Sequence, residues 1–187
     1  MRLTQTMRME TADEILVERA QTGDGEAFAS LVTRHYDLIF RLAFRTLGSR
    51  EAAQDLAQDV CAALPGKLAG FRGEAKFTTW LYRVTTNAAL DRLRKRKNHS
   101  KASENWGELE QMTRAAEAEK RDEVAWLQQA MSQLNDELRQ TVALVLGEEL
   151  THAEAARVLD ISEGTVSWRM SEVKKILRRI AEEEERI

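Results

Sequence analysis

The sequence is poor in residues that break helices, cross-link a chain or bind metals. It contains one proline, one cysteine, three histidines and nine glycines among 187 residues. The single cysteine, Cys61, excludes an internal disulfide framework and a cysteine-rich zinc site. The histidines, His35, His99 and His152, lack the spacing of metal ligands. We therefore expect no metal site and no other cofactor.

Long apolar runs are also missing. No stretch approaches the ~20 apolar residues that span a bilayer. The basic N-terminus, Met1 to Glu10, is not followed by the apolar run of a signal peptide. These absences predict a cytoplasmic protein without membrane insertion.

The residues that are abundant favour helices. Hydrophobic residues make up 43 % of the chain and charged residues 32 %, so a core can form beneath a strongly solvated surface. Ala, Leu, Glu, Arg and Gln are common, and all of them have high helix propensity. The net charge of −3 says little about partners, because the charges are unevenly placed. We expect an all-α fold.

The helical pattern divides the chain into two small helical domains joined by a flexible linker. In the first domain, residues 11–97, apolar residues recur at helical spacing. Breaks in the pattern predict helices that begin at Thr11, Glu26, Arg50 and Thr78. A capping box between Thr11 and Glu14 is expected to start the first helix, and Pro65–Gly66 to end the third.

The linker and the second domain follow. Between residues 98 and 123 the periodicity dissolves into small polar and then mixed charged residues, which is typical of a linker. The second domain, residues 124–187, regains helical spacing. Asn135 is expected to cap one of its helices, and Thr151 with Glu154 forms another capping-box pattern.

The strongest local signal for function lies between Thr151 and Arg179. A capped short helix, the turn Asp160–Ser162 and a second capped helix match a helix-turn-helix. We expect the second helix to point a set of polar, aromatic and basic side chains outward to a major groove: Glu163, Thr165, Ser167, Trp168, Arg169 and Lys174. The alternative is an ordinary helical hairpin with a solvated basic face, but we favour DNA binding.

A basic helix with interleaved aromatics is the second signal. From Trp80 to Lys97, polar residues recur every three or four positions, and aromatics such as Phe71 and Trp80 alternate with Arg72, Lys76 and Arg83. Single-stranded nucleic acid requires this combination, because cations follow its backbone while aromatic faces receive unstacked bases. Taken alone the pattern is weak, since aromatics at helical spacing more often belong to a core.

An acidic stripe is the third signal. Glu51, Asp55 and Asp59 lie four residues apart, with Gln58 alongside. This charge either faces solvent or suits a basic protein partner. Cys61 near the apolar face of the same helix is expected to pack rather than to do redox chemistry. His35 is expected to be a core or partner-facing residue.

No catalytic constellation is present in the sequence. It has no serine elbow, no pair of histidine and carboxylate at metal spacing and no phosphate-binding loop. We therefore expect that the protein is not an enzyme and has no small-molecule substrate.

One motif joins these signals. The run Phe77-x-Thr79-Trp80-Leu81-Tyr82-Arg83-x-x-x-Asn87, preceded by Phe71-Arg72-Gly73, is highly specific. In the second domain, Ile161-Ser162-Glu163-Gly164-Thr165-Val166 accompanies it. The order of segments from Glu14 to Arg179 resembles the extracytoplasmic-function (group IV) subfamily of the bacterial sigma-70 family. The resemblance implies a sigma factor that directs RNA polymerase to promoters in a stress or envelope response, with a region 2 bundle and a region 4 helix-turn-helix.

The resemblance also implies a role for each surface. Asp55, Gln58 and Asp59 would bind core polymerase, which the family contacts through its beta-prime clamp and beta subunits. The residues implied in minus-ten DNA recognition and melting are Phe71, Arg72, Lys76, Trp80, Arg83, Asn87, Arg92, Arg94 and Lys95. Phe71, Lys76 and Asn87 are the candidates for the pocket of a flipped base. The residues implied in minus-thirty-five recognition are Ser162, Glu163, Thr165, Ser167, Trp168, Arg169 and Lys174. An anti-sigma factor is the other partner implied.

Some positions depart from the family pattern. Cys61 stands where an aromatic is common, Ser167 where a basic residue is common, and Trp168 where a small residue is usual.

Two rival interpretations of the function remain at this point. An ordinary helix-turn-helix regulator would bind specific duplex DNA as a free protein, and an interaction protein that sequesters a transcription factor would not recognise bases.

Overall fold

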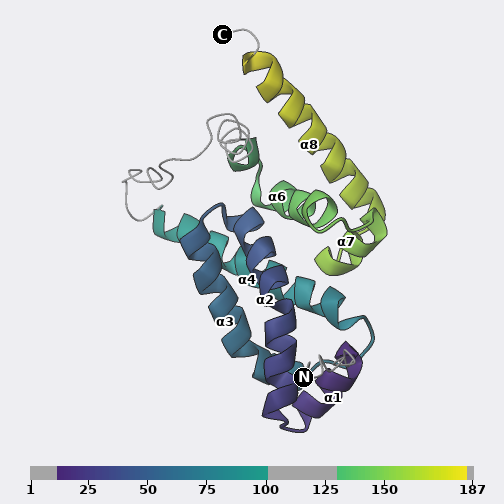
Figure 1. Cartoon of the computed structure of the whole chain (residues 1–187). Helices are drawn as coiled ribbons and strands as arrows, with labels where there is room; N and C mark the ends of the chain where they lie inside the picture. The colour runs from purple at the N-terminus through teal and green to yellow at the C-terminus, as the bar shows by residue number, and fades with distance from the viewer. Residues whose placement is uncertain (1–11, 101–129, 185–187) are drawn as a thin grey trace, which may run out of the picture.

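The computed structural model describes residues 12–100 and 130–184, and within them all regular secondary structure is helical (Figure 1). The first domain consists of α1 (Asp13–Gln21), α2 (Gly25–Leu47), α3 (Arg50–Leu68) and α4 (Phe77–Ser100). The second domain consists of α6 (Asp136–Val142), the π-helical segment η1 (Ala143–Gly147), α7 (His152–Leu159) and α8 (Glu163–Glu184). No helix in these residues is long and apolar enough to cross a membrane.

Local capping signals set most of the helix boundaries. Gly48 ends α2 with a left-handed φ of 72°, and Ser49 accepts a hydrogen bond from the Ala52 N–H at 3.3 Å to begin α3. Asn135 caps α6 in the same way, at 2.9 Å from the Leu138 N–H. The predicted start of the first helix is wrong: Ala12 occupies the N-cap position of α1 and no side chain caps it.

The predicted end of α3 is also wrong, because the helix continues through Pro65 to Leu68. An interior proline costs about 3 kcal/mol or more, since it removes one hydrogen bond and crowds the preceding turn. Leu64 and Leu68 are 4 % and 3 % exposed, and burying each leucine contributes about 1.5–3 kcal/mol. The last turn of α3 therefore forms because the core needs its apolar side chains.

The core of the first domain lies among α1, α2, α3 and α4. Ile39 and Leu81 are completely buried in it, as are Ala43, Ala53 and Ala57. Small side chains let α2 and α3 approach closely along the bundle (Figure 1). The apolar stripe of α3, which includes Leu56 and Val60, faces this core.

The second domain forms the predicted helix-turn-helix. Thr151 and Glu154 make the expected capping box, and Asp160 takes the left-handed conformation at φ 57° in the turn. Ala155 and Val166 are fully buried where α7 and α8 cross. The π-helical turn of η1 precedes them and holds one residue more than an α-helical turn. It closes with a hydrogen bond from the Glu148 N–H to the Ala143 carbonyl at 3.0 Å.

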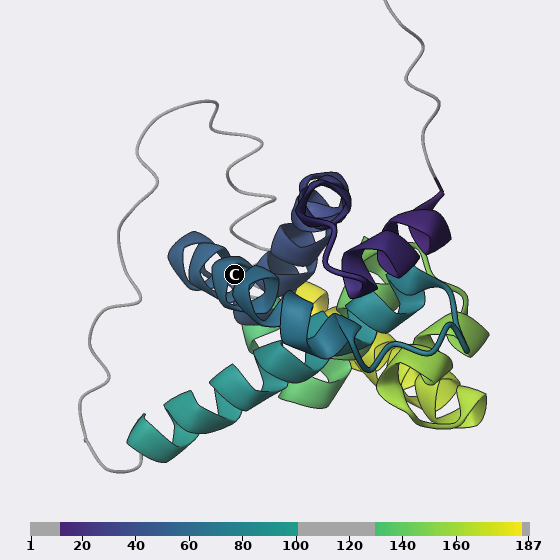
Figure 2. The ribbon, with the colours of Figure 1, turned by 90° about the horizontal axis from the view of Figure 1, so that it is seen from below.

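The two domains pack against each other. The second half of α2 is buried on two faces, since Ile39 belongs to the core of the first domain and Leu42 to that of the second. The helix α7 lies beside α4, while α8 runs away from the first domain (Figures 1 and 2). We call this the closed arrangement. The predicted linker lies mostly outside the described residues, and α4 itself extends to Ser100.

Candidate nucleic-acid interface

The acidic stripe of α3 is open to solvent. Asp55, Gln58 and Asp59 are all exposed on one side of the helix. Arg92 of α4 reaches this surface. Its Nη2 lies 3.3 Å from the Asp55 carboxylate, and its Nη1 lies 3.7 Å from the Asp59 carboxylate. The same Nη1 donates a hydrogen bond to the Ala52 carbonyl at 3.3 Å. The structure thus places Arg92, a predicted DNA-binding residue, against the predicted polymerase-binding carboxylates.

The loop between α3 and α4 is held by an aromatic cluster. The Phe71 ring lies 5.9 Å from the Phe77 ring and 5.3 Å from the Trp80 ring, centre to centre. Phe77 is buried and Trp80 half-buried, so these aromatics are partly core. Arg72 and Lys76 remain exposed on the loop. The cluster therefore supplies a rigid base for two exposed cations.

One residue that sequence reasoning missed anchors the same loop. The side-chain amide of Gln21, at the end of α1, donates to the carbonyls of Leu68 and Phe71, both at 2.9 Å. These contacts join residues 47 and 50 positions apart. A glutamine at a helix end gives no periodic signal that would have revealed this role.

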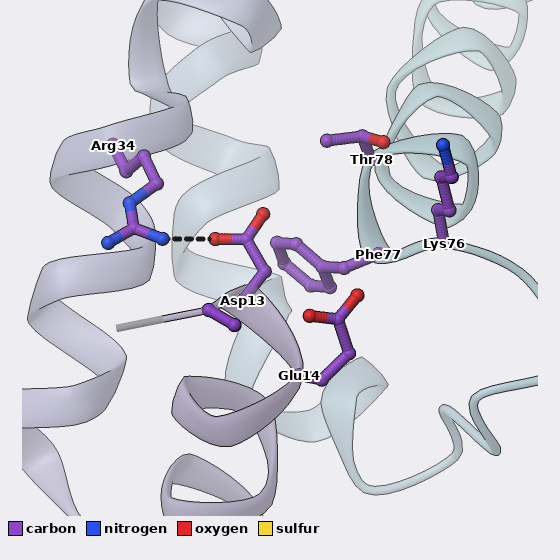
Figure 3. Close-up of a pocket in the computed structure, with 7 residues that line it drawn as sticks. Asp13, Glu14, Arg34, Lys76, Phe77 and Thr78 are labelled. Atoms are coloured by element: carbon purple, nitrogen blue, oxygen red, sulfur yellow. Dashed lines mark hydrogen bonds and ion pairs between the residues drawn. The ribbon is translucent and has the colours of Figure 1, made fainter. Parts of the chain in front are cut away.

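A pocket of about 410 Å³ opens between α1 and the start of α4 (Figure 3). Its lining consists of Ala12, Asp13, Glu14, Arg34, Lys76, Phe77 and Thr78. Arg34 binds the Asp13 carboxylate at 2.6 Å, and the Nε2 of His35 lies 2.9 Å from its second oxygen. His35 is 7 % exposed and packs edge-on against Phe77, so its prediction as a core residue is confirmed. Lys76 lines the pocket, whereas Phe71 and Asn87 do not.

The exposed side of α4 carries the remaining predicted minus-ten residues. Arg83, Asn87, Arg94 and Lys95 are all exposed along it. Arg94 lies 3.7 Å from Asp91 on the same helix. The polar residues that recur along this helix thus share one side, while Leu81 and Leu93 are buried.

The first turns of α8 present a mixed polar and aromatic surface. Ser162 caps the helix, accepting from the Thr165 N–H at 3.0 Å, and its hydroxyl lies 2.8 Å from that of Thr165. Glu163, Ser167 and Lys174 are exposed, and Trp168 is 60 % exposed. The Nδ1 of His152, on α7, lies 2.9 Å from the Ser167 hydroxyl and holds it in place.

Arg169 does not point outward as predicted. Its side chain is only 11 % exposed and forms a 2.6 Å ion pair with Glu137 of α6. Its Nε is buried without a hydrogen-bond partner. The reason is its position on the helix: Val166 and Val173, three and four residues away, form the buried side of α8. Arg169 therefore lies at the edge of the stripe that packs against the rest of the domain.

An ionic cluster around one buried carboxylate joins the two domains. Glu148, at the end of η1, has a side chain that is 4 % exposed. Its carboxylate binds Arg45 and Arg41 of α2, the latter at 3.2 Å, and accepts a hydrogen bond from the Tyr82 hydroxyl at 3.1 Å. We call these four residues the Glu148 cluster.

Further contacts support the closed arrangement. Arg83 donates to the Arg157 carbonyl at 2.7 Å and lies 3.9 Å from the Asp160 carboxylate. The buried amide of Gln140 donates to the Thr86 carbonyl at 3.2 Å. Arg83, a predicted minus-ten residue, is therefore in contact with the helix-turn-helix.

The closed arrangement predicts an abnormal titration of Tyr82. Burial, followed by the charge of Glu148 and its hydrogen bond, raises the pKa of Tyr82 from 10.0 to about 12. Because the folded-state pKa is raised, this stabilisation is complete below pH 10 and is lost as the pH rises towards 12. We expect ultraviolet titration of a Tyr36→Phe variant, which retains only Tyr82, to show the late transition. An ordinary transition would contradict the contact with Glu148.

Comparison with known proteins agrees with the two-domain geometry. Residues 31–99 match the family model "Sigma-70 region 2", and residues 130–179 match "Sigma-70, region 4". The ECF RNA polymerase sigma factor SigW of Bacillus subtilis is 30 % identical over 87 % of this chain and 93 % of its own. The ECF RNA polymerase sigma factor SigM of Mycobacterium tuberculosis is 34 % identical over 92 % of this chain and 86 % of its own.

Solved structures share the fold. CnrH, in complex with the cytosolic domain of CnrY, has a TM-score of 0.68 at 25 % identity, covering 92 % of this chain and 98 % of that one. The sigma factor RpoE of Bartonella quintana, in complex with the anti-sigma factor NepR, has a TM-score of 0.68 at 19 % identity, covering 83 % of this chain and 96 % of that one.

Two helical domains with these matches define a transcription initiation factor of the sigma-70 type. The chain belongs to the extracytoplasmic-function (ECF) RNA polymerase sigma factors. It is therefore a sigma factor, not an enzyme, and the interpretation as an ordinary helix-turn-helix regulator is wrong.

Proposed function

We propose that this sigma factor acts in the cytoplasm with three distinct surfaces, one for polymerase and two for promoter DNA. The observation that supports this division is the separation of charge. The exposed carboxylates lie on α3, whereas exposed cations follow the loop before α4 and the outer side of α4. A surface of carboxylates repels DNA but suits a basic protein partner. The acidic side of α3 is thus the docking surface for the beta-prime clamp of core polymerase. The beta subunit contacts other parts of the chain.

The minus-ten element is read by the first domain. Arg72, Lys76 and Arg83 supply phosphate contacts, and Asn87 supplies hydrogen bonds to a base edge. Melting captures an unstacked base, which costs a few kcal/mol that a preformed pocket offsets. The pocket beside Lys76 in Figure 3 offers carboxylate acceptors and an ammonium donor close to the aromatic cluster. The other proposed minus-ten residues are Phe71, Trp80, Arg92, Arg94 and Lys95.

The minus-thirty-five element is read by the start of α8. Ser167 and Trp168 are the exposed residues best placed for base contacts, and Lys174 for a phosphate contact. Ser162, Glu163 and Thr165 set and flank the helix start. Arg169 acts through its ion pair with Glu137, supporting the domain that presents this surface. The linker follows the end of α4 at Ser100 and joins the two DNA-binding domains.

An anti-sigma factor is the partner that regulates this protein, in a stress or envelope response. The closed arrangement supports this proposal, because Arg83 of the minus-ten surface is engaged there by the Arg157 carbonyl of the second domain. CnrH, which is similar to this chain over both domains, was solved bound to another protein's cytosolic domain. A partner that binds both domains at once would hold them in the closed arrangement.

Run-off transcription with bacterial core polymerase tests the proposed function. We expect the protein to direct transcripts from defined start sites on genomic fragments, and core polymerase alone to give none of them. Tight binding of the free protein to specific duplex DNA, without such transcripts, would overturn the assignment of the surfaces.

Replacing Asp55 with arginine tests the docking surface. We expect the Kd for core polymerase to rise about tenfold or more, which corresponds to ~1.4 kcal/mol, because a carboxylate facing a basic partner becomes a repelling cation. Asp55 is 56 % exposed and its pair with Arg92 contributes little to stability, so thermal unfolding should not change. Glu18→Arg, an exposed reversal on α1, is the matched control. Equal core affinity for both variants would remove α3 from the docking surface.

A further inference from the structure

The Glu148 cluster has the composition of an anion-binding site. Arg41 and Arg45 lie one turn apart on α2, and Tyr82 reaches the same point from α4. All three direct donors at one carboxylate that is almost completely buried. This site belongs to the first domain, and its occupant, Glu148, belongs to the second.

The donor set suits a phosphate as well as a carboxylate. Guanidinium groups bind carboxylates and phosphates through the same parallel pairs of hydrogen bonds. A phosphodiester carries one negative charge on two free oxygens, as a carboxylate does. The tyrosine hydroxyl supplies one more donor to either group. The donors that bind Glu148 therefore also suit a DNA backbone phosphate.

The position of the site continues the proposed minus-ten surface. Arg83, the neighbour of Tyr82, also lies close to acceptors of the second domain, namely the Arg157 carbonyl and the Asp160 carboxylate. Lys97 at the other end of α4 binds Asp136 of α6 at 2.7 Å. Carboxylates and carbonyls of the second domain thus bind a series of basic side chains that runs from α2 along α4. A nucleic-acid backbone would bind the same side chains.

Promoter binding requires that Glu148 leave this site. Elements centred near positions −10 and −35 are separated by about 25 base pairs, which is roughly 85 Å at 3.4 Å per base pair. In the closed arrangement α4 contacts α7, so the minus-ten and minus-thirty-five surfaces lie too close together to reach both promoter elements at once. Separation of the domains removes Glu148 and leaves Arg41, Arg45 and Tyr82 exposed beside Arg83.

We propose that Arg41, Arg45 and Tyr82 form a binding site for a promoter DNA backbone phosphate adjoining the minus-ten surface, which Glu148 occupies in the closed arrangement. This inference rests on the proposed function of α4. Glu148 competes with DNA for the site, so opening of the domains and binding of the promoter are coupled. The continuity with Arg83 favours DNA over an acidic segment of the polymerase as the ligand.

Salt dependence of promoter binding by the holoenzyme provides the test. Each phosphate that the protein neutralises contributes about −0.9 to the slope of log K against log salt, so loss of this one site in Arg41→Gln/Arg45→Gln should make the slope less negative by about 0.9. Affinity should fall about tenfold or more for every promoter sequence alike. Arg19→Gln/Arg50→Gln removes the same charge from exposed positions outside the site and should leave the slope unchanged.

Two further variants keep the test independent of folding. Tyr82→Phe retains the packing and removes only the hydroxyl, so it should lower affinity a few-fold without changing the slope. Glu148→Gln weakens the occupant and leaves the site intact, so it should raise promoter affinity. An unchanged slope for the double arginine variant would overturn the phosphate site. Loss of core-polymerase affinity with an unchanged slope would assign the arginines to a protein contact instead. Failure of the wild-type holoenzyme to initiate at any promoter would be a failure of the proposed function itself.

Discussion

Replacing Glu148 with alanine is expected to separate the two domains of the free protein. The carboxylate is the only acidic group at the centre of the Glu148 cluster, and its loss leaves Arg41 and Arg45 facing each other across a partly buried site. Removing one partner of a buried pair costs about 3–5 kcal/mol, and exposure of Arg41 reduces the expected cost here to about 2 kcal/mol. The equilibrium between closed and open protein should then shift roughly 30-fold towards the open form.

Energy transfer between dyes on α3 and α8 would measure this shift. Glu149→Ala is the matched control, because Glu149 is the neighbouring residue, has the same charge and is exposed. We expect the average distance between the dyes to grow in Glu148→Ala and to stay constant in Glu149→Ala. An equal response of the two variants would mean that the Glu148 cluster does not hold the domains together.

Replacing Arg139 with methionine is expected to cost about 2–4 kcal/mol of stability in the second domain. Its guanidinium donates to the carbonyls of Met131, Leu134 and Ser132 at 3.0, 2.9 and 3.3 Å. A further contact, at 3.5 Å, reaches the Thr46 carbonyl of α2. Residues 130–132 are helical, so these bonds supply donors to carbonyls at the end of this helical segment. Burial lowers the pKa of Arg139 although Asp136 acts in the opposite direction, as expected of a partly desolvated cation.

Chemical denaturation, followed by circular dichroism, would measure the loss. Arg139→Lys serves as the control for charge, because an ammonium group retains the charge but cannot reach carbonyls on several sides at once. We expect the lysine variant to recover only a part of the lost stability. Full recovery would show that the charge, and not the fork of donors, stabilises the domain.

Short-range signals in the sequence predicted much of the fold. Asn135 and the pair Thr151–Glu154 cap the helices that the sequence predicted, because a cap depends only on a few neighbouring residues. Gly48 and Ser49 act in the same local way between α2 and α3. The left-handed turn at Asp160 was predictable for the same reason.

Features that depend on distant residues could not be predicted in this way. The helix α3 passes through Pro65 because Leu68 is needed in the core, and Arg169 turns inward because α6 lies beside it. Arg92 lies across the acidic stripe of α3 for a similar reason. The contact between Glu148 and Arg41 joins residues 107 positions apart in two different domains, so no periodicity connects them.

The extra residue in η1 sets the phase of the chain that follows it. A π-helical turn holds one residue more than an α-helical turn, and each residue of a helix rotates its successors by about 100°. If one residue were lost between Ala143 and Gly147, the turn could close as an ordinary α-helix, but Glu148 would leave it in a different direction. Chain length within a single turn, as much as the side chain at position 148, therefore determines whether the carboxylate meets Arg45. Relatives that differ here by one residue would keep both domains intact and lose their mutual alignment.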